Sequence, residues 1–236
     1  MTDPTPRQLT FDLPHRPALG AEDFLVGASN ETALAMIDSW PHWPHFAAIV
    51  EGAAQSGKTH LANVWRYRSG AETCDAVDLT EADVGRFSRA KTFVVENLDQ
   101  GVGDERTLFH MLNLAREHKL SMLLTSAKSP GDLTVTLPDL RSRLRAIPLV
   151  SIGPPDDALL RAVLVKLFAD RQLTVEPTVI AFVLARMERS IAAAETIVGE
   201  LDSLSLATHR KVSRALAGDI LARLGSPQDA TDVSDS

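Results

Sequence analysis

The segment GAAQSGKT, at residues 52–59, is the strongest structural signal in the chain. It fits the pattern G-x-x-x-x-G-K-[ST], follows an apolar run at 46–52 and precedes a helical pattern that begins near Lys58. The glycines let the backbone curl, so that successive N–H groups and the positive end of the helix face phosphate oxygens. Lys58 would neutralise the terminal phosphates, and the Thr59 hydroxyl would ligate Mg²⁺. The segment predicts a phosphate-binding loop; the alternative is an ordinary glycine turn.

Short apolar runs alternate with helical patterns around this loop. Besides 46–52, strand-like runs occupy residues 74–79, 93–97 and 120–126. Apolar residues at the spacing of one helix face predict a helix over 104–118. After Pro155 the pattern changes, and we expect helices at 156–170, 177–187, 190–208 and 214–223. Strands that alternate with helices predict an α/β fold with a largely parallel sheet covered on both sides, followed by a small all-helical domain.

The whole chain has the composition of a globular protein. Its 236 residues allow one domain, or one domain with a small satellite. Hydrophobic residues make up 44% and charged residues 23%, which excludes a disordered chain and a coiled coil. We expect four parts, which are a flexible tail at 1–20, the nucleotide-binding α/β domain at 21–152, a helical lid domain at 156–223 and a disordered acidic tail at 224–236.

Charge and cysteine content narrow the classes of function. The net charge of −7 opposes a sequence-independent nucleic-acid binder, because such binding depends on the neutralisation of phosphates. The single cysteine, Cys74, excludes an internal disulfide and a cysteine metal cluster, and we expect it to be a buried strand residue. No apolar stretch approaches the roughly 18 residues that span a bilayer, and the N-terminus lacks the layout of a signal peptide. These features predict a cytoplasmic protein without membrane contact.

A phosphate-binding loop also needs a carboxylate on a neighbouring strand, which holds the water shell of the metal. Glu96 is the candidate, because it stands near the end of the run FVVEN. Most such proteins carry Asp at this position, commonly followed by a Glu that activates water. Here Asn97 follows, and its amide cannot serve as a general base. We therefore expect Mg²⁺ at Thr59 and Glu96, partly through water, with weak intrinsic hydrolysis. In the alternative interpretation, Glu96 and Asn97 only end a strand.

Four segments together resemble the DnaA family of bacterial AAA+ replication initiators. They are FLVGASN at 24–30, the phosphate loop, VVENLD at 94–99 and LPDLRSRL at 137–144. The resemblance extends over roughly residues 8–222 and is greatest to the short members of the family, the regulatory inactivators that lack a DNA-binding domain. It implies a P-loop AAA+ fold, in which helices sandwich the parallel sheet and a small helical lid follows.

The resemblance also implies roles for individual residues. Residues 24–30 would lie against the base, and Arg143 would be an arginine finger that reaches the nucleotide of an adjacent subunit. Such a finger stabilises the charge that develops on a transferring phosphoryl group. The alternative for Arg141, Arg143 and Arg145 is a solvated helix face. The residues expected to bind ADP or ATP are Phe24, Val26, Gly27, Asn30, Gly52, Ala53, Ala54, Gln55, Ser56, Gly57, Lys58, Thr59, His60, Glu96 and Arg189.

Two further positions depart from the family pattern. The sensor position after the fourth predicted strand is Ala127, which leaves Thr125 or Ser126 as the nearest polar group. In the lid, Ala192 stands where a sensor arginine is expected, and Arg189, three residues away, is a candidate substitute. These departures argue against efficient self-hydrolysis, and they favour a protein that holds ADP as a structural or conformational ligand.

The N-terminal segment at 8–13 resembles the peptide by which such proteins dock on the DNA polymerase III β sliding clamp. An extended peptide can insert alternate apolar side chains into a groove, while a glutamine hydrogen-bonds at its edge. Prolines at 4, 6, 14 and 17 isolate the segment from the fold. The alternative is an edge strand packed on the protein's own sheet. The segment consists of Gln8, Leu9, Thr10, Phe11, Asp12 and Leu13.

Together these features predict a negative regulator of bacterial replication initiation. It would be a nucleotide-bound adaptor at the replisome, which docks on the DNA-loaded clamp and promotes hydrolysis of the ATP bound to DnaA. Because the resemblance does not include the helix-turn-helix domain of DnaA, we expect no direct sequence-specific DNA binding. The alternatives are an autonomous AAA+ ATPase of the helicase-loader type and a clamp-bound replisome scaffold. The sequence leaves open whether ADP or ATP is the working ligand, and whether the protein is a monomer or a homodimer.

Overall fold

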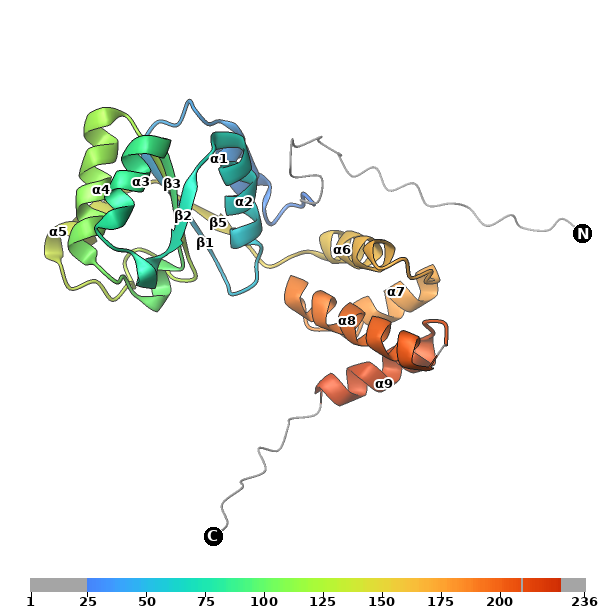
Figure 1. The fold of residues 1–236 in the computed structure, drawn as a ribbon. Coiled ribbons are helices and arrows are strands. Elements are labelled where there is room, and N and C mark those ends of the chain that lie inside the picture. The colour runs from blue at the N-terminus through green and yellow to red at the C-terminus, as the bar shows by residue number, and fades with distance from the viewer. Residues whose placement is uncertain (1–24, 209, 226–236) are drawn as a thin grey trace, which may run out of the picture.

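The computed structural model describes residues 25–208 and 210–225. It contains a five-stranded parallel sheet with helices on both faces, and a second group of helices that follows the last strand (Figure 1). The predicted α/β fold is confirmed. The sheet order is β2-β3-β4-β1-β5, which places the strand before the phosphate loop between two neighbours. The strands are β1 (Ala47–Gly52), β2 (Glu72–Asp75), β3 (Thr92–Glu96), β4 (Ser121–Ser126) and β5 (Leu149–Ile152).

Helices from different parts of the chain cover the two faces of the sheet. Two helices contribute to the apolar cluster on one face, namely α1 (Glu31–Asp38) and α2 (Lys58–Ser69). Three contribute to the cluster on the other face, namely α3 (Ala82–Ala90), α4 (Glu105–His118) and α5 (Pro138–Ala146). The remaining helices share a third apolar cluster and are α6 (Asp157–Asp170), α7 (Pro177–Leu184), α8 (Ile191–Thr208) and α9 (Arg214–Gly225).

The central strands are apolar on both faces, and this explains their unbroken apolar runs. In β1, Ile49 packs into the cluster with α4, whereas Val50 packs into the cluster with α2. In β3, Val95 packs into the cluster with α4, and Val94 packs into the cluster with α2. Because successive side chains of a strand point to opposite faces, a sheet covered on both sides needs apolar residues at every position. The same alternation places Glu96 on the face of β3 that carries Val94 and is covered by α2.

Two parts of the sheet differ from the sequence-based expectation. The run at 74–79 is not one strand, because β2 ends at Asp75 and a 3₁₀ turn follows at Ala76–Asp78. The Asp75 carboxylate accepts a hydrogen bond from the Val77 N–H at 3.2 Å, which caps that turn. Conversely, β5 was not predicted, because its short segment LVSI alternates exposed and less exposed residues at the sheet edge.

Among the described residues, no helix combines the length and the apolar composition that crossing a membrane requires. Cys74 lies in β2 as expected, but it is only partly buried.

Three tryptophans fix α1 and α2 to each other. Trp65 of α2 is fully buried, with Trp43 stacked on it at 5.2 Å between ring centroids and Trp40 edge-on at 6.0 Å. The Trp43 Nε1–H donates to the Met36 carbonyl of α1 at 2.7 Å. The indole N–H of Trp65 has no hydrogen-bond partner among the described residues, so the ring contributes through packing.

We expect Trp65→Ala to lower the free energy of unfolding by about 3–5 kcal/mol, because it leaves a cavity between two aromatic rings. Trp65→Phe keeps most of the contact area and loses no hydrogen bond, so its cost should be less than half as large. Urea unfolding followed by circular dichroism measures both. Equal losses in the two variants would show that packing is not what Trp65 contributes.

Cys74 should react slowly in the folded protein. Burial, followed by the nearby Asp83 carboxylate, raises the pKa of the Cys74 thiol from 9.0 to about 12. At pH 8 the thiolate fraction is therefore roughly a thousandfold smaller than in the unfolded chain. We expect iodoacetamide to modify Cys74 quickly in urea and slowly without it.

The raised pKa of the Cys74 thiol also makes the free energy of unfolding depend on pH. The unfolded thiol ionises first as the pH rises, so the stabilisation that is present at neutral pH is lost between about pH 9 and 12. Cys74→Ala should remove that pH dependence.

Candidate nucleotide-binding site

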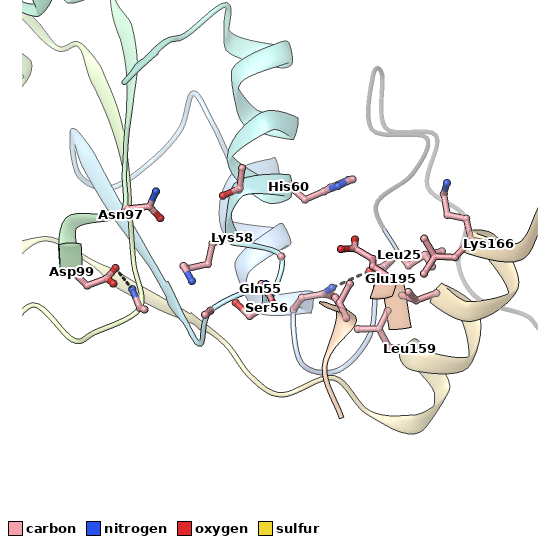
Figure 2. Close-up of a pocket in the computed structure, with 18 of the residues that line it drawn as sticks. Leu25, Gln55, Ser56, Lys58, His60, Asn97, Asp99, Leu159, Lys166 and Glu195 are labelled. Carbon is pink, nitrogen blue, oxygen red and sulfur yellow. Dashed lines mark hydrogen bonds between the residues drawn. The ribbon is translucent and has the colours of Figure 1, made fainter. Parts of the chain in front are cut away.

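A cavity of about 610 Å³ lies where β1, β3 and β4 end (Figure 2). The carboxyl ends of parallel strands are the usual ligand edge of an α/β sheet. The helices α6 and α8 close the opposite side of the cavity. Its lining residues are Leu25, Asn30, Ala54, Gln55, Ser56, Gly57, Lys58, Thr59, His60, Asn97, Asp99, Gln100, Ala127, Leu159, Val163, Lys166, Leu167, Ile191 and Glu195.

The loop between β1 and α2 is shaped by its glycines. Gly57 has φ +100° directly before α2, a conformation that L side chains rarely adopt. At Gly52 a Cβ atom would lie 2.5 Å from the Ser56 Oγ, so a side chain there would force the loop open. The Ser56 Oγ is buried and has no hydrogen-bond partner in the described structure. A buried hydroxyl in a loop at a helix N-terminus fits a site for phosphate oxygens.

Lys58 lies inside this loop. Its Nζ donates to the carbonyl oxygens of Gly52 at 2.7 Å and Ala53 at 2.8 Å, and only 7% of the residue is exposed. Burial lowers the pKa of the Lys58 ammonium, and the Asp99 carboxylate partly opposes that effect. The loop therefore holds a partly desolvated cation, which stabilises an anion more strongly than a cation in water does.

Beyond Lys58, the strand ends present groups that the sequence analysis assigned only in part. The Asn97 N–H donates to the Thr125 Oγ1 at 3.1 Å, and the Asn97 amide donates to the Asp75 carboxylate at 2.6 Å. Thr125 is fully buried and does not line the cavity, so it tethers β3 to β4 and does not take the sensor position. The Ser126 hydroxyl is likewise occupied, because it donates to the Lys128 carbonyl at 2.6 Å.

Asp99 is one of the cavity residues that the sequence analysis missed, and it lies close to the phosphate loop. It follows β3 in a 3₁₀ turn (Leu98–Gln100), and its Oδ1 accepts a hydrogen bond from the Ala127 N–H at 2.6 Å (Figure 2). The available signal was its place three residues after Glu96, since parallel strands direct the segments that follow them toward one edge. The structure thus places a carboxylate next to the alanine at the expected sensor position.

Only one of the two residues predicted to hold Mg²⁺ lines the cavity. Thr59 lines the cavity, whereas Glu96 is not among the lining residues. Glu96 lies on the face of β3 that is covered by α2, the helix that carries Thr59. Its role in the metal's water shell remains a prediction. Among the described residues, no group of three or more histidine, cysteine, aspartate or glutamate side chains could hold a metal by itself.

The other end of the cavity is mainly apolar and is formed by the segment before α1 together with α6 and α8, which also contribute Lys166 and Glu195. The buried Asn30 folds this segment, because its Oδ1 accepts from the Gly27 N–H at 2.9 Å and its Nδ2 donates to the Leu25 carbonyl at 2.9 Å. A Cβ atom on Gly27 would lie 3.1 Å from the Leu159 Cβ, so this glycine lets α6 approach closely. The apolar lining suits a flat base and consists of Leu25, Leu159, Val163, Leu167 and Ile191.

Most of the predicted nucleotide-binding residues meet at the cavity. Of those that do not line it, Gly52 and Ala53 bind Lys58, whereas Gly27 supports the apolar end. Val26 packs against the cluster around α2. Phe24 and the predicted clamp peptide lie outside the described residues. The lining residues that were predicted are Asn30, Ala54, Gln55, Ser56, Gly57, Lys58, Thr59 and His60.

Arg189 is not at the cavity. Its guanidinium forms a 2.6 Å ion pair with Asp157 at the start of α6, and 65% and 59% of the two side chains are exposed. Ala192 also lies outside the cavity lining and borders a separate surface depression. Among the described residues, no arginine of the lid lines the cavity.

Arg143 lies on α5, away from the cavity lining. Its guanidinium stacks over the Phe109 ring of α4 at 5.6 Å from the centroid, and the residue is half-buried. The Glu105 carboxylate, also on α4, accepts hydrogen bonds from the N–H groups of Thr136 at 2.8 Å and Leu137 at 2.6 Å. These two bonds fix the start of α5, so α4 positions both that helix and its arginine.

We expect Lys58→Ala to weaken nucleotide binding by roughly 10–100-fold, because it removes a charge-assisted hydrogen bond to phosphate. Isothermal titration calorimetry with ADP measures the loss. Lys128→Ala is the matched control, since Lys128 does not line the cavity and should leave the affinity unchanged. Unchanged ADP affinity in Lys58→Ala would contradict the assignment of the loop.

Comparisons with known proteins agree with this geometry. No protein-family model matches the chain. The replication initiator DnaA of Cutibacterium acnes is 24% identical over 228 residues, which cover 86% of this chain and 46% of that protein. The chain thus spans about half the length of the curated relatives it matches.

Two solved structures show the fold. Domain III of Thermotoga maritima DnaA superposes with a TM-score of 0.71 at 18% identity and covers 91% of this chain and 100% of that one. AMPPCP-bound DnaA from Aquifex aeolicus gives a TM-score of 0.63 at 19% identity, with 81% and 67% coverage. Over most of its length this chain is similar in sequence to part of the replication initiator DnaA, and its fold is similar to that of DnaA domain III.

Proposed function

We propose that this protein is a negative regulator of bacterial chromosome replication, a regulatory inactivator of DnaA of the Hda type. In this proposal it is a nucleotide-bound adaptor. It docks on the DNA-loaded sliding clamp through residues 8–13 and promotes hydrolysis of the ATP bound to DnaA. Its place of action is the cytoplasmic replisome, and it makes no sequence-specific DNA contact of its own.

Adenine nucleotide is the ligand that the cavity fits best. One end has the phosphate loop with the buried cation of Lys58, and the other end is lined mainly by apolar side chains, which suit a base. The similar DnaA of Aquifex aeolicus was solved with the adenine nucleotide analogue AMPPCP. Thr59 and Glu96 would hold Mg²⁺, partly through water, and the metal would supply positive charge beside the phosphates.

The surroundings of the phosphate loop favour a holder of nucleotide over an efficient ATPase. The Asn97 side-chain amide donates a hydrogen bond to the Asp75 carboxylate, and it cannot act as a general base. Arg189 pairs with Asp157 outside the cavity, and the sensor position is Ala127. Groups that would activate water or stabilise transferring charge are thus missing from these positions. This supports a protein that regulates an ATPase and turns over ATP slowly itself.

The position of Arg143 is the single observation that carries the proposal. An arginine that served this chain's own nucleotide would line its cavity, yet Arg143 does not, and it lies on a helix braced by Phe109 and Glu105 of α4. An arginine finger acts on the nucleotide of an adjacent subunit, so it must be presented outward. A homodimer would present it to a second copy of this chain, and a mixed complex would present it to DnaA.

The decisive experiment measures ATP turnover by DnaA from the same organism, with this protein, ADP and DNA-loaded clamp present. We expect the wild-type protein to accelerate ATP turnover by DnaA. Arg143→Ala should lose most of that acceleration, because an arginine finger typically raises the rate of hydrolysis by about 10³-fold or more. Arg145→Ala is the matched control on the same helix, because its exposed guanidinium makes only a 3.4 Å contact with the Gly131 carbonyl.

The docking part of the proposal has its own variant. Leu9→Ala/Phe11→Ala should abolish stimulation in the presence of clamp, because it removes two of the three apolar anchors of the peptide. The double variant should bind ADP as the wild type does, which separates docking from nucleotide binding. Unchanged DnaA turnover, together with rapid hydrolysis by this protein alone, would instead identify an autonomous ATPase. Stimulation that needs the peptide but survives Arg143→Ala would identify a clamp-bound scaffold.

A further inference from the structure

Asp99 lies at the end of the cavity opposite the apolar lining. Figure 2 shows Asp99, Asn97 and Lys58 at one end and Leu25, Leu159 and Lys166 at the other, with the phosphate loop between them. A nucleotide with its base at the apolar end would therefore direct its phosphate chain past the loop and toward Asp99. The last phosphate of the chain would come closest to this carboxylate.

The groups around Asp99 give the terminal phosphate few donors. The Ala127 N–H, at the position where a polar sensor is expected, already donates to the Asp99 Oδ1 at 2.6 Å. The Asn97 N–H donates to Thr125, and the Asn97 amide donates to Asp75. Three donors at the ends of β3 and β4 are thus used within the protein, and what remains facing the cavity includes an acidic group.

We propose that Asp99 is a specificity-determining residue that makes the site select nucleoside diphosphate over triphosphate. This inference rests on the proposed function in one respect, namely that the cavity binds adenine nucleotide. A β-phosphate ends at the loop and Lys58, where N–H groups and a cation surround it. A γ-phosphate extends further and brings its negative charge toward the Asp99 carboxylate, which repels it in a partly desolvated cavity. The site would retain ADP while cellular ATP competes for it.

The competing role for a cavity carboxylate is to hold the water shell of Mg²⁺, which would favour the triphosphate. The structure favours repulsion for two reasons. One Asp99 oxygen is already held by the Ala127 N–H, which takes up part of the carboxylate's capacity to accept hydrogen bonds from metal-bound water. Glu96, in contrast, lies on the face of β3 covered by α2, the helix that carries the metal-binding hydroxyl. The metal and the repelling charge are thus assigned to different carboxylates.

Equilibrium titrations with ADP and with the ATP analogue AMPPCP test the inference, each with Mg²⁺ and with EDTA. The wild-type protein should bind ADP at least about tenfold more tightly in both conditions. Asp99→Asn keeps an acceptor for the Ala127 N–H and removes the charge. It should raise AMPPCP affinity about tenfold and change ADP affinity little. Asp99→Glu should keep the selectivity of the wild type.

Asp78→Asn is the matched control, because Asp78 is an exposed carboxylate after β2 that does not line the cavity. Retained ADP affinity certifies that each variant is folded. Equal binding of the two nucleotides by the wild type, or an unchanged ratio in Asp99→Asn, would overturn the inference and leave the proposed function standing. If Asp99→Asn weakened AMPPCP binding in Mg²⁺ but not in EDTA, that result would overturn the inference and show that Asp99 helps to hold the metal. Failure of the wild type to bind either nucleotide would overturn both proposals.

Discussion

Two hydrogen bonds from the Lys58 ammonium to the carbonyls of Gly52 and Ala53 hold the phosphate loop closed. They tie the first turn of α2 to the end of β1, the strand that pairs with β4 on one side and β5 on the other. The loop can close this tightly only because Gly52 has no side chain to meet Ser56. A buried ammonium is costly unless its charge is satisfied, so the same bonds that shape the loop keep a cation ready for phosphate.

The helical part of the chain meets the sheet domain through a few close contacts. Gly27 lies against Leu159 of α6, and the Gly153 N–H, which follows β5, donates to the Ser29 carbonyl at 2.9 Å. Both contacts involve the segment folded by Asn30. The cavity is therefore built from two separately packed groups of elements. A ligand that touches both would couple their relative position to its own binding.

The sequence predicted the elements whose pattern is strong and local. The phosphate loop, β1, β3, β4 and the helices after Pro155 follow from one motif and from apolar periodicity. The sequence did not predict side-chain contacts between residues that are far apart in the chain. Thr125 accepts a hydrogen bond from the Asn97 N–H, and Arg189 forms an ion pair with Asp157, contacts that join residues 28 and 32 positions apart.

Asp99 was missed for a related reason. Its significance depends on the distance from its carboxylate to the Ala127 N–H, which lies 28 positions further along the chain. The place of Asp99 just after a predicted strand indicated the edge of the sheet, but it did not indicate Ala127 as the partner.

The support of Arg143 by α4 reduces the conformational entropy that this side chain would lose in the proposed contact with a partner. A long arginine side chain loses roughly 2 kcal/mol of rotamer freedom when it is fixed in an interface. Because the guanidinium already rests on Phe109 and α5 is held by Glu105, part of that ordering is complete before a partner arrives. In the proposed contact with a partner's nucleotide, such an arginine would be partly preorganised, and more of its interaction energy would remain for discriminating one nucleotide state from another.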